Sequence, residues 1–123
     1  MEALILAGAL LVVIWGTAHL FPTRNVVEGF GDAAQDNKRI ITMEWLFEGI
    51  TLIFIGLLVI LVTLLGNISG NINRIVYWAS AAMLVVMAII SSLTGGKVNF
   101  LFYKLCAPIF TASALLILLG TLV

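Results

Sequence analysis

Two carboxylates, Glu44 and Glu48, stand four residues apart in a stretch that is otherwise strongly apolar. On an α-helix this spacing places both side chains on nearly the same face, with Glu48 about 6 Å further along the axis. An ionised carboxylate near the centre of a bilayer costs about 2.5–3.5 kcal/mol. We therefore expect Glu48 to face other protein segments, where it either titrates or contacts a ligand, or else forms a buried ion pair that fixes helix register. Glu44 also suits the first turn of a helix, because a carboxylate there complements the helix dipole.

Four further residues complete the candidate polar cluster. His19 lies at the end of the first apolar stretch and Arg24 follows in the next connection, while Tyr103 and Lys104 begin the last apolar stretch. A four-span topology brings all of these positions to the same side of the membrane. The sequence thus predicts a polar or ligand-binding cluster made of His19, Arg24, Glu44, Glu48, Tyr103 and Lys104, with no catalytic residue assigned.

The same cluster contains residues that can bind a metal ion. His19, Glu44 and Glu48 are acceptable ligands for zinc or iron. However, the Glu-x-x-His pattern of di-iron bundles is absent and the chain holds a single histidine. We therefore predict neither a metal nor a cofactor. Cys106 is the only cysteine, which excludes an intrachain disulfide, and we interpret it as a small packing residue.

The elements that must position these residues follow from composition. Hydrophobic residues make up 63% of the 123-residue chain and charged residues 10%, with a mean hydropathy of +1.22; soluble domains carry about 25% charge. Apolar stretches at about 3–20, 40–65, 75–93 and 100–122 are each long enough to cross a bilayer as a helix. We expect an all-α integral membrane four-helix bundle forming a single transmembrane domain over residues 1–123. The zero net charge gives no reason to expect nucleic acid as a partner.

The connections predict the arrangement and orientation of these helices. Short links at 66–74 and 94–99 favour antiparallel neighbours, with 40–65 beside 75–93 and 75–93 beside 100–122. Lys and Arg mark the cytoplasmic side of a membrane protein. One side carries a single such residue, Arg74, and the other carries five: Arg24, Lys38, Arg39, Lys97 and Lys104. Both termini are therefore predicted to be non-cytoplasmic in a multi-pass protein of the cell membrane.

The long connection at 21–39 holds turn and helix signals. Pro22 should end the first helix. The apolar residues Val26, Val27 and Phe30 allow either a short amphipathic helix at the membrane surface or an ordinary connector. Further on, Asp36 or Asn37 resembles the N-cap of the second long helix.

Small and aromatic residues suggest how the helices pack. Gly8, Gly16, Gly49 and Gly56 would allow close helix contact. Aromatic residues are more numerous in the half that holds the carboxylates. They either anchor that half at the membrane boundary or line a pocket for an apolar ligand. These residues are Trp15, Phe21, Phe30, Trp45, Phe47, Phe100, Phe102 and Tyr103.

The segment 15–22, which reads Trp-Gly-Thr-Ala-His-Leu-Phe-Pro, resembles small bacterial four-helix membrane proteins of the DoxX-like group. In that group the first helix often ends in a glycine, a histidine and a nearby proline. The resemblance covers this segment and the four-span layout. Some members of the group are reported as partners in redox assemblies, but the resemblance implies a layout in the bacterial inner membrane more than an activity. His19 is the only residue that it carries across.

Two functions agree with these features. The first is an accessory or assembly subunit that contacts membrane lipids and either other membrane subunits or copies of itself. The alternative is a proton-coupled small-molecule transporter or a binder of an apolar ligand, a lipid or quinone, that uses Glu48. An enzyme is less expected, because the chain has no nucleotide motif, thiol pair or multi-histidine site.

Overall fold

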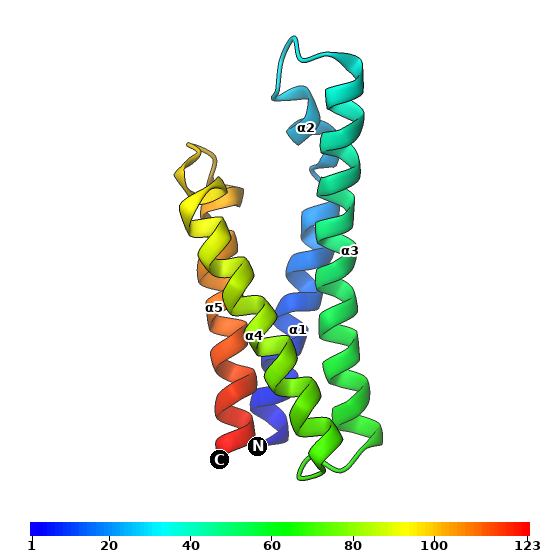
Figure 1. Ribbon diagram of the computed structural model, residues 1–123, viewed down its shortest axis with the longest axis vertical. Coiled ribbons are helices and arrows are strands. Elements are labelled where there is room, and N and C mark those ends of the chain that lie inside the picture. The colour runs from blue at the N-terminus through cyan, green and yellow to red at the C-terminus, as the bar shows by residue number, and fades with distance from the viewer.

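The computed structural model describes residues 1–123, and its regular structure is entirely helical (Figure 1). Four helices are long and apolar enough to cross a membrane, which confirms the all-α class and the four candidate spans of a multi-pass protein. Two short helices lie in the connections between them. In chain order the elements are α1 (Glu2–Leu20), α2 (Thr23–Glu28), α3 (Gln35–Leu65), α4 (Asn71–Leu93), the 3-10 turn η1 (Gly95–Lys97) and α5 (Leu101–Leu122).

The helix boundaries differ from the prediction mainly at α3. This helix begins at Gln35 rather than near residue 40, and its N-cap position is Ala34, so the prediction of Asp36 or Asn37 as N-cap is wrong. Hydropathy marks where a helix enters lipid, whereas the polar residues that precede Ile40 can continue the same helix in water. Asp36 lies in the first turn, where its charge complements the helix dipole. In the preceding connection a short helix does form, α2, which holds Val26 and Val27 but ends before Phe30. Its place at a membrane surface stays a prediction.

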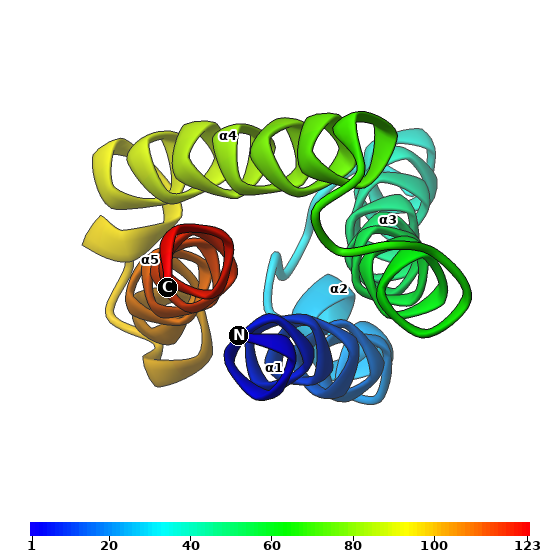
Figure 2. The same ribbon diagram turned by 90° about the horizontal axis from the view of Figure 1, so that it is seen from below.

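The long helices do not contact one another equally. Helix α1 packs extensively against both α3 and α5, and α4 packs against α5, whereas α3 and α4 make few contacts. Figures 1 and 2 show α4 crossing near the end of α3 and then running away from it toward α5, with both chain termini at the same end of the molecule. The expected contact between 40–65 and 75–93 is thus small. Close to the 66–70 turn, Asn73 donates a 2.6 Å hydrogen bond to the Val62 carbonyl.

Glycines explain why α1 takes the place beside α3. A Cβ added at Gly16 would lie 2.8 Å from the Gly49 carbonyl oxygen, and one added at Gly56 would lie 2.7 Å from the Ala9 carbonyl oxygen. The two backbones therefore touch at two levels, and only glycine permits the approach. On another face of α1, a Cβ at Gly8 would lie 2.8 Å from the Ser113 carbonyl oxygen of α5. Close packing of this kind is the main source of helix association in lipid.

Candidate functional site

The end of α1 is fixed by hydrogen bonds to its last carbonyl groups. These carbonyls have no partner within the helix, and Pro22 supplies no amide hydrogen. The indole Nε1 of Trp45 in α3 donates a 2.7 Å hydrogen bond to the His19 carbonyl, and the Thr23 hydroxyl donates a 2.6 Å hydrogen bond to the Leu20 carbonyl. Helix α3 thereby holds the backbone that carries His19.

Aromatic rings fix the His19 side chain. Its imidazole is fully buried and stacks on the Trp45 indole, with ring centroids 3.7 Å apart and an interplanar angle of 17°. The Phe102 ring of α5 lies 5.7 Å away on a tilted plane, and it stacks in turn on Trp15 at 4.6 Å. Three helices therefore build the walls around one histidine, and they leave its ring little freedom to turn.

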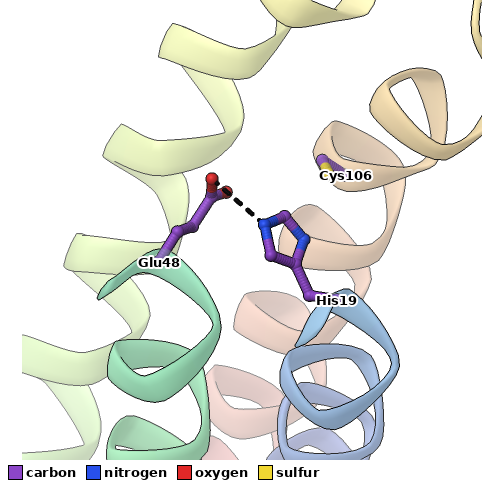
Figure 3. Close-up of side chains that lie close together, drawn as sticks. All are labelled: His19, Glu48 and Cys106. Carbon is purple, nitrogen blue, oxygen red and sulfur yellow. Dashed lines mark ion pairs between the residues drawn. The ribbon is translucent and has the colours of Figure 1, made fainter. Parts of the chain in front are cut away.

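Glu48 approaches this imidazole from α3 (Figure 3). Its Oε2 lies 3.4 Å from His19 Nε2, within the range of an ion pair, and its side chain is 33% exposed. The N–H direction does not meet the oxygen well enough for a hydrogen bond, and neither ring nitrogen of His19 has a hydrogen-bond partner. An imidazole always carries at least one N–H, and leaving such a buried donor unpaired costs about 1–3 kcal/mol. The pair therefore keeps unused hydrogen-bonding capacity.

Cys106 of α5 is a third member that sequence reasoning missed, because a lone cysteine on an apolar helix looks like a packing residue. Its Sγ, a nitrogen of His19 and a carboxylate oxygen of Glu48 all lie within 4.8 Å of one another. Figure 3 shows the three side chains converging from different helices. The thiol currently donates a long 3.5 Å hydrogen bond to the Phe102 carbonyl. One signal was available, since Cys106 follows Tyr103 by three residues and so shares its helix face.

A cavity of about 300 Å³ opens beside these three side chains, and α4 forms its opposite wall. Besides His19, Glu48 and Cys106, it is lined by Met87, Ile90, Ser91, Thr94, Gly95 and Tyr103. A second hollow of about 550 Å³ forms a groove between α3 and α4, lined largely by apolar residues such as Ile40, Phe47 and Met83. Glu48, Met87 and Tyr103 line both, so Glu48 lies where a polar cavity meets an apolar groove.

The other predicted site residues divide into two groups. Tyr103 is half-buried, packs edge-on against Trp45 at 5.4 Å and 78°, and lines the cavity. Glu44 is exposed and lines only the groove. One turn of helix thus separates a carboxylate that reaches the cluster from one that does not.

The two predicted cations lie apart from Glu48. Arg24 is exposed on α2 and pairs with Glu28 at 2.8 Å, a hydrogen bond that raises the pKa of its guanidinium above the usual value. Lys104 is exposed, with its Nζ 3.4 Å from Asn99 Oδ1. Because Lys104 is one residue beyond Tyr103, it points to a different face of α5. His19 is therefore the basic group that Glu48 meets.

Fold and site together define a small protein with four candidate membrane spans and a His–Glu–Cys cluster beside a cavity. Comparison with protein-family models, curated proteins and solved structures finds no match to this chain. The resemblance of residues 15–22 to the DoxX-like group stays a prediction.

Proposed function

We propose that this chain binds an amphiphilic ligand, a lipid or quinone, with the ligand's polar head in the cavity and its apolar part along the groove between α3 and α4. The observation that supports this most directly is the position of Glu48, which lines both hollows. Volumes of about 300 and 550 Å³ fall within the range of about 300–1,000 Å³ typical of small-molecule pockets. Small-molecule pockets are also typically lined by apolar side chains with a small number of polar groups among them.

The polar groups suit a head group that both accepts and donates hydrogen bonds. The His19 imidazole has unpaired nitrogens, and Glu48 has a partly exposed carboxylate. Binding a head group here would satisfy groups that the protein leaves unpaired, which favours the bound state. A proton could pass between Glu48 and His19 as the ligand changes its own protonation. Such an exchange would couple ligand binding to the uptake or release of a proton.

We further infer that the spans form an antiparallel bundle with the cluster near the cytoplasmic boundary and both termini on the other side. The asymmetry of Lys and Arg supports this orientation. Glu48 precedes the end of α3 at Leu65 by 17 residues, which is about 26 Å along the helix in a hydrocarbon layer of about 30 Å. At that depth, a bound amphiphile can place its head near water and its tail in lipid.

The test is a comparison of two carboxylates on the same helix. Wild type, Glu48→Gln and Glu44→Gln are purified in mild detergent and titrated with decylubiquinone and, separately, with a short-chain phospholipid, and binding is followed by native mass spectrometry. We expect Glu48→Gln to weaken binding of one of these probes at least tenfold, or about 1.4 kcal/mol. Glu44→Gln should change it less than twofold. Equal affinities for the two variants, or no saturable binding of either probe, would overturn the proposal.

A second candidate, an accessory or assembly subunit, is favoured by the sparse contact between α3 and α4. The groove exposes large apolar side chains, among them Phe47 and Met83, which a helix of another subunit could cover. Co-purification from native membranes in mild detergent tests this candidate. A stable partner that is displaced by Phe47→Ser would support it, and a solitary monomer would count against it.

A further inference from the structure

We propose that His19, Glu48 and Cys106 bind a divalent transition-metal ion of the zinc type. The three residues belong to α1, α3 and α5, and their ligand atoms lie within 4.8 Å of one another. The metal site does not depend on amphiphile binding, because it needs only the side chains of His19, Glu48 and Cys106 at one side of the cavity. It also revises the expectation from sequence that the chain holds no metal site.

The spacing of the ligand atoms is close to what a tetrahedral ion requires. Zinc bonds of about 2.0–2.2 Å to nitrogen and oxygen and about 2.3 Å to sulfur place neighbouring ligand atoms about 3.3–3.6 Å apart. His19 Nε2 and Glu48 Oε2 already lie 3.4 Å apart. The thiol must come closer, by about 1 Å from the longest separation, which a side-chain rotation supplies. That movement would give up the 3.5 Å hydrogen bond from the thiol to the Phe102 carbonyl.

The state of His19 is the second, independent observation. Its ring is fully buried, faces the other two ligands, and has no hydrogen-bond partner at either nitrogen. Stacking on Trp45 prevents the ring from turning to find one. A metal ion at Nε2 would satisfy the bare nitrogen of the neutral imidazole and leave the proton on Nδ1. Buried polar groups without partners are uncommon in native structures, and a bound ion is one way in which such groups are satisfied.

The ligand types and charges select the kind of ion. Mg²⁺ and Ca²⁺ prefer sets made wholly of oxygen, whereas one nitrogen, one carboxylate and one thiolate suit Zn²⁺ and similar ions. On binding, the Cys106 thiol releases its proton to water and becomes a thiolate. Glutamate and thiolate then neutralise the 2+ charge, so the bound site carries no net charge, as a membrane interior favours. With three protein ligands, the fourth position faces the cavity, which is the arrangement of zinc sites that bind a further molecule.

Cobalt provides a spectroscopic test. Purified protein in detergent is titrated with Co²⁺, whose tetrahedral complexes absorb in the visible and whose thiolate bond gives a near-ultraviolet charge-transfer band. We expect one Co²⁺ per chain, displaced by Zn²⁺, with the charge-transfer band lost in Cys106→Ser. Affinity should fall at least tenfold in His19→Asn and Glu48→Gln, whereas Glu44→Gln, a matched change one turn away, should bind as the wild type does.

A second measurement needs no change at the cysteine. Cys106 is the only thiol, so its alkylation by N-ethylmaleimide reports on that site alone. We expect Zn²⁺, but not Mg²⁺, to slow alkylation at least tenfold in wild type and Glu44→Gln, and to give no protection in Glu48→Gln. Circular dichroism and size-exclusion chromatography establish that each variant is folded. A folded wild type with no thiolate band and no zinc protection, or equal behaviour of Glu48→Gln and Glu44→Gln, would overturn the metal site. Neither assay contains decylubiquinone or added phospholipid, so their failure leaves the ligand-binding proposal standing.

Discussion

Replacement of Trp45 by Phe tests how the site is held. The change removes the 2.7 Å hydrogen bond to the His19 carbonyl but keeps a ring that can stack on the imidazole. Hydrogen bonds between membrane helices are worth about 0.6 kcal/mol on average and up to about 1.7. The His19 carbonyl is also left without a partner at a buried helix end, which costs more than an average bond. We therefore expect Trp45→Phe to destabilise the fold by about 1–2 kcal/mol, or about 5- to 30-fold in the folding equilibrium.

The matched control is Trp78→Phe on α4. Trp78 is 48% exposed, whereas Trp45 is 6% exposed. Both variants lose the same atoms. The difference between their free energies of unfolding therefore reports the hydrogen bond to His19 and the burial of Trp45 against α1. Reversible unfolding in mixed micelles of increasing dodecyl sulfate content, followed by circular dichroism, gives both free energies. If the two variants lose equal stability, the Trp45 indole does not fix the end of α1, and our account of how His19 is positioned fails.

Gly16→Ala, with Gly95→Ala as its control, and Tyr77→Phe test the contacts that hold the helices together. Gly16→Ala should destabilise the fold by about 1–3 kcal/mol through overpacking, because its Cβ would lie 2.8 Å from the Gly49 carbonyl oxygen. Gly95→Ala, whose Cβ would meet Tyr103 at an ordinary 3.5 Å, should change stability much less in the same unfolding assay. Tyr77→Phe removes the buried 3.0 Å hydrogen bond to Thr63 and should cost about 0.6 kcal/mol and at most about 1.7. Thr63 keeps its 2.7 Å hydrogen bond to the Val59 carbonyl in this variant. A loss of stability above about 1.7 kcal/mol would therefore contradict the view that Tyr77→Phe removes a single hydrogen bond.

Composition and hydropathy were sufficient to predict the helices, because lipid requires each backbone to satisfy its own hydrogen bonds. They could not predict that α3 starts at Gln35, since the polar residues before Ile40 carry no hydropathy signal that marks a helix. The short connections also did not determine which helices pack together along their length. The 66–70 turn ties α3 to α4 only at their ends, whereas glycine contacts bring α1 against α3 along their length.

The candidate site was predictable where burial of charge is costly. The Glu48 carboxylate must be shielded from lipid by other protein segments. His19, at the end of the first helix, lies at a similar depth and is its basic partner. Cys106 carries no such cost, since a thiol packs as a small hydrophobe. Its three-residue spacing from Tyr103 was the one signal that could have marked it as a site residue. The predicted topology places Arg24 and Lys104 on the same side of the membrane as Glu48, but it does not say which face of its helix each side chain occupies.

The convergence of α3 and α5 beside the cavity, on which the His–Glu–Cys cluster depends, can be measured directly by cross-linking. In Glu48→Cys the new sulfur takes the place of the Glu48 Cγ, two bonds short of the carboxylate oxygen that lies within 4.8 Å of the Cys106 Sγ. We therefore expect the two sulfurs to lie close enough for a short bridging reagent. Dibromobimane, which fluoresces when it bridges two neighbouring thiols, is added to native membranes containing this variant or Glu44→Cys. We predict rapid fluorescence for Glu48→Cys and background for Glu44→Cys. Background fluorescence for both, or equal fluorescence for the two, would contradict the site as described.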